Sequence, residues 1–253
     1  MDTYRMIGAE LLKLRRRSLV AWTGVLTLGA SVAFVVFNAI RHRADPTHYG
    51  PAGGATNLQH AALVLRYLGT VAAVLVGTTA GGQDRASGMF RDLVTTGTSR
   101  RTLFLVRLPA ALAFYLVWFL PAYTIAAVAS IGLAGPLPAP HWRLLVQFGL
   151  GVGVSTTVDV VLAVGMAATL GSRSVATGIL LGWELAFSRL LEHVNSFGSL
   201  RQLLTTSAVD RIFPALGEPR VVPMTALTAG LVLTGWAVLI ITTGTWRTAT
   251  RDA

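Results

Sequence analysis

The sequence predicts an all-α polytopic membrane protein with about six transmembrane helices, and its composition and charge pattern carry this prediction. Apolar residues make up 53% of the 253-residue chain, and the mean hydropathy is +0.61, more than a soluble core requires. Charged residues make up only 13%. They gather between apolar runs of about 20 residues or more, the length that a helix needs to cross a bilayer.

The amino-terminal region predicts an amphipathic entry helix over residues 1–17, lying on the inner face of the membrane. Its apolar side chains recur at spacings of three and four, and it ends in the basic run 13–17. The next apolar run, residues 18–40, is longer than the apolar region of a cleaved signal peptide, about 7–15 residues. We therefore expect a first span whose amino end is cytoplasmic.

Further apolar runs predict the remaining spans. Residues 83–101, between the second and third runs, are basic, amphipathic and too polar to enter the bilayer. Residues 195–221 are also too polar to span, so we expect an extracellular segment there, with a short interfacial helix over residues 200–213 before the last span. The expected spans are residues 58–82, 102–133, 142–170, 175–193 and 222–243.

The distribution of basic residues gives the orientation. With the amino terminus inside, the inner segments hold more Lys and Arg than the outer segments, which predicts two cytoplasmic termini in a multi-pass protein of the cell (inner or plasma) membrane. The net charge of +10 does not indicate nucleic-acid binding, because the Arg residues flank apolar runs instead of forming a solvated stripe with interleaved aromatics.

Several kinds of chemistry are excluded by residue types that the sequence lacks. Without Cys, the chain has no disulfide, thiolate metal site or cysteine nucleophile. Its only lysine, Lys13, lies in Leu-Leu-Lys-Leu, so no phosphate-binding loop ending in Gly-Lys-Ser/Thr exists. Neither His-Glu-x-x-His nor Gly-x-Ser-x-Gly occurs. We therefore expect no enzyme activity, metal or cofactor in this chain.

Ionisable residues inside the expected spans are functional candidates, because a charge in the bilayer is costly. Arg66 in the second span and Glu184 in the fifth should lie at similar depths, and one hypothesis is that they pair or line one polar cavity. The alternative is that Arg66 snorkels outward and Glu184 bonds a neighbouring helix. Asp159 in the fourth span is a further candidate, which could bond Thr156 or Ser155 locally.

Large apolar side chains share the fifth span with Glu184. Leu180, Trp183 and Phe187 could form an apolar wall for a hydrophobic substrate, although aromatics in membrane helices more often pack or lie in interfacial belts. Pairs of glycines four residues apart permit close approach of helices, either within the chain or at a subunit interface. These pairs are Gly77 and Gly81, Gly149 and Gly153, and Gly178 and Gly182.

Two short segments and the overall layout resemble the membrane subunit of type-2 ABC exporters, the ABC-2 permease family. Residues 82–101 read Gly-Gln-Asp-Arg-Ala-Ser-Gly-Met-Phe-Arg-Asp-Leu-Val-Thr-Thr-Gly-Thr-Ser-Arg-Arg, and residues 10–15 read Glu-Leu-Leu-Lys-Leu-Arg. In this family, the loop after the second span carries an acidic residue, a Gly-Thr pair and Pro-x-Ser-Arg. That loop forms a cytoplasmic coupling helix, which docks on the ATPase subunit.

The chain keeps part of that family pattern, but Met89 stands where Thr is usual and Gly97 where Pro is usual. The resemblance implies that residues of the entry helix and of residues 83–101 couple the chain to its ATPase. These residues are Glu10, Lys13, Asp84, Arg85, Gly88, Phe90, Arg91, Leu93, Ser99 and Arg100.

The resemblance also implies the partners and the substrate class. Two separate ABC ATPase subunits would bind ATP and Mg²⁺, and a second permease copy or a similar permease would complete the complex. The substrate would be a hydrophobic or amphipathic compound, such as a drug, antibiotic, lipid or peptide, moved outward. Its pathway would involve Arg66, Asp159, Leu180, Trp183, Glu184 and Phe187.

Two other functions remain open at this stage. A transporter or channel driven by an ion gradient would favour inverted repeats or several acidic residues near the bilayer midplane, and the two halves show no clear repeat. A membrane scaffold that transports nothing would have the same spans without an ATPase partner.

Overall fold

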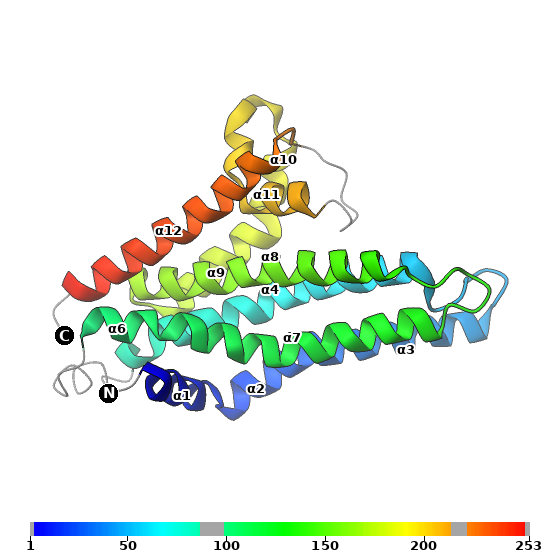
Figure 1. Ribbon diagram of the computed structural model, residues 1–253, viewed down its shortest axis with the longest axis horizontal. Coiled ribbons are helices and arrows are strands. Elements are labelled where there is room, and N and C mark those ends of the chain that lie inside the picture. The colour runs from blue at the N-terminus through cyan, green and yellow to red at the C-terminus, as the bar shows by residue number, and fades with distance from the viewer. Residues whose placement is uncertain (1–2, 87–98, 214–221, 251–253) are drawn as a thin grey trace.

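The computed structural model describes residues 3–86, 99–213 and 222–250, with the side chains of residues 17 and 83–86 left aside, and these ranges are helical without any strand (Figure 1). Six helices are long and apolar enough to cross a membrane, which confirms the all-α class and the expected number of spans. They are Ser18–Ala44, Gly54–Gly82, Arg100–Gly132, Trp142–Leu170, Arg173–His193 and Ala226–Thr250.

The first span follows an amino-terminal helix that packs on the helix bundle. Helix α1 contacts α7 and buries Met6, Glu10 and Leu14, whereas Tyr4 and Leu12 on its other side are exposed. The first span itself contains a π-helical turn, η1, between two α-helices. The elements are α1 (Thr3–Leu14), α2 (Arg17–Gly24), η1 (Val25–Gly29) and α3 (Ala30–Ala44).

The second, third and fourth spans form the helix core, which we define as α4, α7 and α8. Helix α4 makes its most extensive contact with α8, where glycines let the two backbones approach closely. A Cβ atom added to Gly77 would lie 2.5 Å from the Cβ of Ala163, and one added to Gly81 would lie 2.3 Å from the carbonyl oxygen of Val164. The elements are α4 (Gly54–Ala86), α6 (Arg100–Leu105), α7 (Arg107–Gly132) and α8 (Trp142–Leu170).

The remaining elements form what we call the α9–α12 arm, which diverges from the helix core away from the chain termini (Figure 1). The fifth span is interrupted by a π-helical turn, η2, and is followed by a 3₁₀-helix and the short helix α11. The elements are α9 (Arg173–Gly182), η2 (Trp183–Phe187), α10 (Ser188–His193), η3 (Asn195–Leu203), α11 (Thr205–Ile212) and α12 (Ala226–Thr250).

The last span differs from its predicted bounds, because α12 continues to Thr250 where the sequence predicted a tail after residue 243. The hydroxyl groups of threonines in this region donate to carbonyl groups four residues earlier, so these polar side chains stay within the helix. Close packing also holds the end of α12, since a Cβ atom on Gly244 would lie 2.6 Å from the ring of Phe104.

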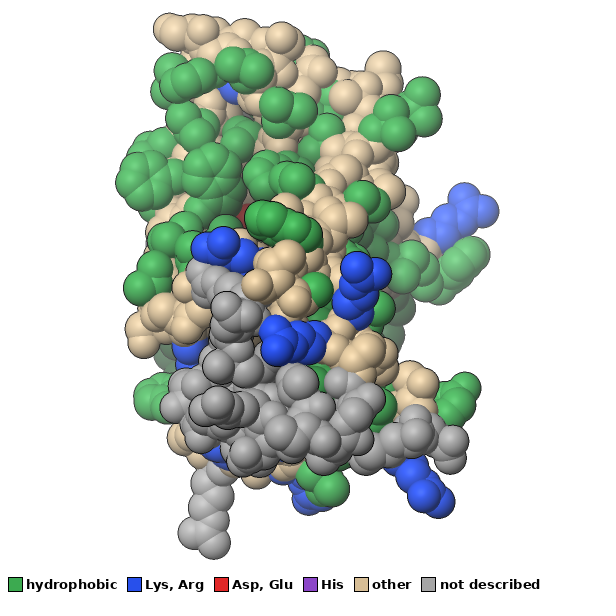
Figure 2. All heavy atoms as spheres, turned by 90° about the vertical axis from the view of Figure 1, so that its left-hand side faces the viewer, with side chains coloured by type: hydrophobic (Ala, Val, Ile, Leu, Met, Phe, Trp, Pro, Cys, Tyr) green, Lys and Arg blue, Asp and Glu red, His purple; other side chains and the backbone are tan. Residues whose placement is uncertain are grey.

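The beginning of α1 and the end of α12 lie at the same end of the bundle (Figure 1). Figure 2 looks at this end, and Lys and Arg side chains gather on it. Exposed arginines on or beside α1 and in the first turns of α6 and α9 are Arg5, Arg15, Arg16, Arg101 and Arg173.

Helix α11 departs most from the sequence prediction. We predicted an interfacial helix over residues 200–213 at the outer surface. In the structure, residues 200–203 end the 3₁₀-helix η3, α11 covers Thr205–Ile212, and Thr205–Val209 are buried against α12 and α8. Asp210 of α11 contacts Arg66, which lies near the middle of the second span, Gly54–Gly82. The structure thus buries most of the segment predicted as an interfacial helix between spans, with Asp210 in contact with a residue near the middle of the second span.

Candidate functional site

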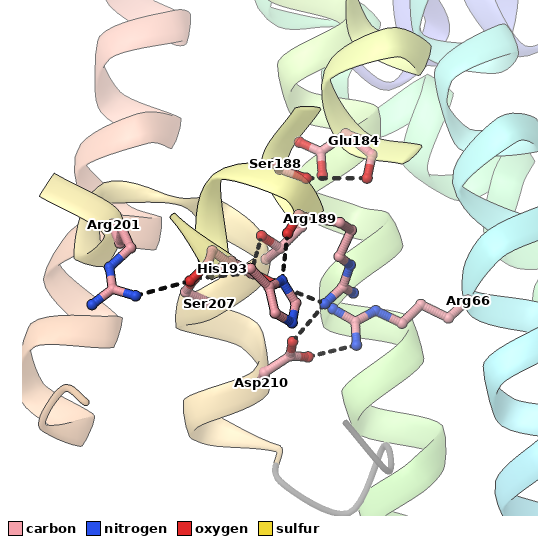
Figure 3. A network of polar contacts seen from close by, with 10 residues as sticks. Arg66, Glu184, Ser188, Arg189, His193, Arg201, Ser207 and Asp210 are labelled. Carbon is pink, nitrogen blue, oxygen red and sulfur yellow. Dashed lines mark hydrogen bonds and ion pairs between the residues drawn. The ribbon is translucent and has the colours of Figure 1, made fainter. Parts of the chain in front are cut away.

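A charged cluster joins the second span to the fifth span and α11. We define it as Arg66, Arg189, Glu192 and Asp210 (Figure 3). The carboxylate of Asp210 lies between the two guanidinium groups, 2.5 Å from Nη1 of Arg66 and 2.9 Å from Nη1 of Arg189. Arg189 also lies 3.3 Å from Glu192, one turn further along the same helix.

Hydroxyl groups of α11 complete the hydrogen bonding of Glu192. Thr206 and Ser207 both donate to its Oε1, over 2.6 and 2.9 Å, and Glu192 is only 4% exposed. A buried charged group is stable only when it is paired and hydrogen-bonded, and the Thr-Thr-Ser sequence that begins α11 supplies those donors. The charged cluster therefore explains why such a polar helix is buried.

Two further carboxylates lie near this cluster without an ion pair among the described residues. Asp159 accepts a hydrogen bond of 2.6 Å from Thr70, and Glu184 accepts one of 3.1 Å from Thr205. They are 4% and 8% exposed. Their hydrogen-bond partners are hydroxyl groups.

The structure separates the predicted residues Arg66 and Glu184 into different contacts. Arg66 is 3% exposed and pairs with Asp210, so it does not snorkel outward, and the described residues show no ion pair between Arg66 and Glu184. Figure 3 shows Glu184 set apart from the point where Arg66, Arg189 and Asp210 meet. We considered that Asp159 could bond Thr156 or Ser155 of its own helix. In the structure it instead accepts a hydrogen bond from Thr70 of α4.

Apolar cavities flank two tryptophans of the α9–α12 arm. One cavity, of about 200 Å³, lies between α8, α9 and α12, and its walls include Leu180, Trp183, Thr205 and Trp236. A second, of about 180 Å³, lies on the η3 side of the same tryptophans. Phe187 is 60% exposed and lines neither of these cavities, so the predicted wall of Leu180, Trp183 and Phe187 is only partly correct.

The π-helical turn η2 positions a side chain that lines the 200 Å³ cavity. It comprises Trp183–Phe187, so it carries both a cavity tryptophan and Glu184. A π-helical turn changes the direction of side chains along a helix and often marks a functional site. Here it turns Trp183 and Glu184 inward while Phe187 points outward.

The predicted coupling residues are only partly within the described residues. Glu10 is 8% exposed and lies 2.7 Å from Nζ of Lys13, so these two form an ion pair on α1. Ser99 caps α6 by accepting a bond from the backbone N–H of Thr102, and Arg100 begins that helix. Residues that lie outside the described side chains or ranges are Asp84, Arg85, Gly88, Phe90, Arg91 and Leu93.

Residues of this polar region that sequence reasoning missed are Thr70, Arg189, Glu192, Thr205, Thr206, Ser207 and Asp210. It had placed Asp210 and Thr205 in an outer segment by hydropathy. The available signal was the spacing of Arg189 and Glu192, three residues apart on one helix and thus able to pair.

No protein-family model matches this chain, and no curated protein matches it either. Its functional interpretation rests on the geometry above and on the sequence.

Proposed function

We propose that this chain is the transmembrane subunit of an ATP-driven ABC exporter, an ABC-2 permease that forms the pathway for a hydrophobic or amphipathic substrate. The charged cluster with its neighbouring carboxylates carries the proposal. Ionisable side chains at bilayer depth are costly and mark substrate or ion pathways. In this chain they lie between the second span, the fourth span, the fifth span and α11, next to apolar cavities that could hold an apolar substrate.

The energy source in this proposal is a separate pair of ATPase subunits, which bind ATP and Mg²⁺. Two features of the sequence support this assignment: no Gly-Lys-Ser/Thr loop exists, and residues 82–101 resemble the family's coupling helix. The basic end of the bundle, where α1 begins and α12 ends, would face the cytoplasm and those subunits, in accordance with the positive-inside rule.

A second permease copy, or a similar permease, is also part of the proposal. Only 22%, 22% and 17% of an apolar 18-residue stretch in the first, fifth and sixth spans is buried, so much of their apolar surface is left for lipid or another subunit. Among the described residues, no atom lies within 4 Å of a Cβ added to Gly178, and one added to Gly182 would meet only the ring of Phe187, at 3.9 Å. This third glycine pair, unlike the pair in α4, therefore brings no second span close within the described part of the chain.

Transport driven by an ion gradient is the second candidate. It is favoured by Asp159 and Glu184, buried carboxylates that lack an ion pair among the described residues and could exchange a proton or bind a cation. A scaffold without transport is the third possibility. It gives no reason for the cost of burying these charges.

The test is to purify the tagged chain from its native membrane and to measure bound ATPase subunits and transport into inverted vesicles. We expect an ATPase to co-purify, and we expect transport that needs ATP and persists when ionophores abolish the ion gradient. Substituting Arg91→Glu should abolish ATPase binding. Arg43→Glu, which changes an exposed arginine at the opposite end of the bundle, is the matched control.

The outcomes separate the three candidates. Transport that stops with the ionophore and ignores ATP would favour the ion-gradient transporter. If no ATPase co-purifies and no transport is measured, the scaffold is the remaining candidate. Loss of ATPase binding in both variants would show that Arg91 has no specific role.

A further inference from the structure

The cavity between α8, α9 and α12 combines aromatic walls with a nearby buried carboxylate. Its volume is about 200 Å³, and the indole rings of Trp183 and Trp236 form part of its wall. An apolar cavity of about 150 Å³ accommodates benzene, so this cavity has room for one ring with a small substituent.

The orientation of Trp236 is fixed by its polar edge. Its Nε1 donates a hydrogen bond of 2.8 Å to the carbonyl oxygen of Leu203, which ties α12 to the end of η3. The indole ring therefore separates the 200 Å³ cavity from the 180 Å³ cavity on the η3 side, and both cavities share Trp183 and Trp236. Indole faces attract cations, and a fixed ring loses little entropy on binding one.

Glu184 places a carboxyl group at the same wall. It directly follows Trp183, and its Oε1 accepts a hydrogen bond of 3.1 Å from Thr205, which itself lines the cavity. Leu180, one turn earlier on the helix, lines the cavity too. The carboxylate therefore lies directly behind the cavity wall and is only 8% exposed.

Carboxyl groups outnumber guanidinium groups around this wall. The described region holds the carboxyl groups of Asp159, Glu184, Glu192 and Asp210 and the guanidinium groups of Arg66, Arg189 and Arg201. Arg66 and Arg189 pair with Asp210, Arg189 also pairs with Glu192, and Arg201, which lines the 180 Å³ cavity, donates to the carbonyl oxygen of Glu192 and to Oδ1 of Asn195. Asp159 and Glu184 receive hydroxyl donors alone, so a bound cation would favour the ionised form of these carboxyl groups.

We propose that this cavity binds a small organic monocation with an apolar body, whose charge faces Glu184 while its body lies against Trp183 and Trp236. That such a cation is the exported substrate rests on the proposed function. The binding itself does not, because it requires only this chain.

The test uses phenyltrimethylammonium and its neutral isostere tert-butylbenzene, which have the same shape and differ in charge. Binding to the purified full-length chain in lipid nanodiscs is measured by calorimetry, and the signal from empty nanodiscs is subtracted for each compound. We expect the cation to bind at least about tenfold more tightly than the isostere, as a charge-assisted contact and a cation–π contact together imply.

Glu184→Gln should bring the two affinities to within about threefold, because it removes the charge and keeps the acceptor for Thr205. Trp183→Leu should weaken cation binding by about fivefold and change binding of the isostere less. Asp45→Asn removes an acidic residue of the loop between α3 and α4, far from the cavity in the fold, and should leave both affinities unchanged.

Equal affinities of the two compounds for the unmodified chain, or no binding of either, would overturn the proposal without any variant. Cation preference that persists in Glu184→Gln would overturn the role of Glu184. These failures would leave the exporter proposal intact, whereas cation binding without a co-purifying ATPase would reject the exporter and keep the cation site.

Discussion

The helix core and the α9–α12 arm are held by different interactions. In the core, 67%, 56% and 61% of an apolar 18-residue stretch in the second, third and fourth spans is buried, and glycines bring α4 against α8. In the arm, only 22% and 17% of such a stretch in the fifth and sixth spans is buried, and polar contacts tie α11 to α4 and α10. The core thus depends on close packing of its helices, whereas the arm combines close packing of α12 at Gly244 with the polar contacts of α11.

The largest loss of stability is expected when Asp210 is substituted, since its carboxylate is shared by the guanidinium groups of Arg66 and Arg189. Asp210→Asn should lower the free energy of unfolding by about 3–5 kcal/mol, because removing one member of a buried pair leaves the others uncompensated. Reversible unfolding of the chain in mixed micelles, followed by circular dichroism, measures the change.

A double variant tests whether the loss comes from the pair itself. In Arg66→Gln with Asp210→Asn, the loss should be smaller than the sum of the two single losses by about 1–3 kcal/mol. Asp45→Asn, at an aspartate of the loop between α3 and α4, should cause little change. Additive losses would show that Arg66 and Asp210 contribute separately.

In the helix core, we expect a large loss of stability when Gly81 is replaced by a larger residue. Gly81→Val places a side chain where a Cβ already lies 2.3 Å from the carbonyl oxygen of Val164, so α4 and α8 must move apart, at a cost of about 2–3 kcal/mol. Gly178→Val is the matched control, because nothing lies within 4 Å of its added Cβ. The same unfolding measurement in micelles compares them.

Equal losses in the two glycine variants would contradict the distinction between the core and the arm. A loss only in Gly178→Val, seen in bilayers but not in micelles, would indicate that the outer face of α9 contacts another subunit.

The sequence was sufficient to predict the six spans, because each span is a long apolar run and hydropathy is a local property. The span at Trp142–Leu170 agrees with its predicted bounds. The end of α12 was not predictable in this way, because hydropathy does not reveal that threonine hydroxyls such as that of Thr248 bond back to their own helix.

The position of α11 could not be predicted from local properties, since its burial depends on charges far away in the chain. Arg66 and Asp210 are separated by 144 residues, and the sequence around either residue does not indicate its partner. Arg66 was recognised as costly and in need of a partner, but the helix that supplies this partner is too polar to be taken for a buried element.

A smaller loss of stability is expected at the contact between α12 and η3. Trp236→Phe keeps an aromatic ring beside the cavities and removes the hydrogen bond to the carbonyl oxygen of Leu203. The variant should lose about 1 kcal/mol of stability, the usual net value of one hydrogen bond. Amide hydrogen exchange of η3 should accelerate while that of α8 stays unchanged, and equal acceleration in both would show a global effect.

The smallest effect concerns Asp45, which closes a turn outside both regions. The hydroxyl of Thr47 donates to its Oδ1 over 2.6 Å, and the backbone N–H groups of His48 and Thr47 do so over 3.0 and 3.1 Å. These bonds, the Thr47 hydroxyl first, hold the pKa of Asp45 below its usual value of 3.8. A lowered pKa stabilises the fold above that usual value, and this stabilisation is lost as the pH falls through the lowered pKa. Thr47→Val should therefore raise the pKa of Asp45 toward 3.8 in a carboxyl NMR titration, and an unchanged pKa would exclude the hydroxyl as its main cause.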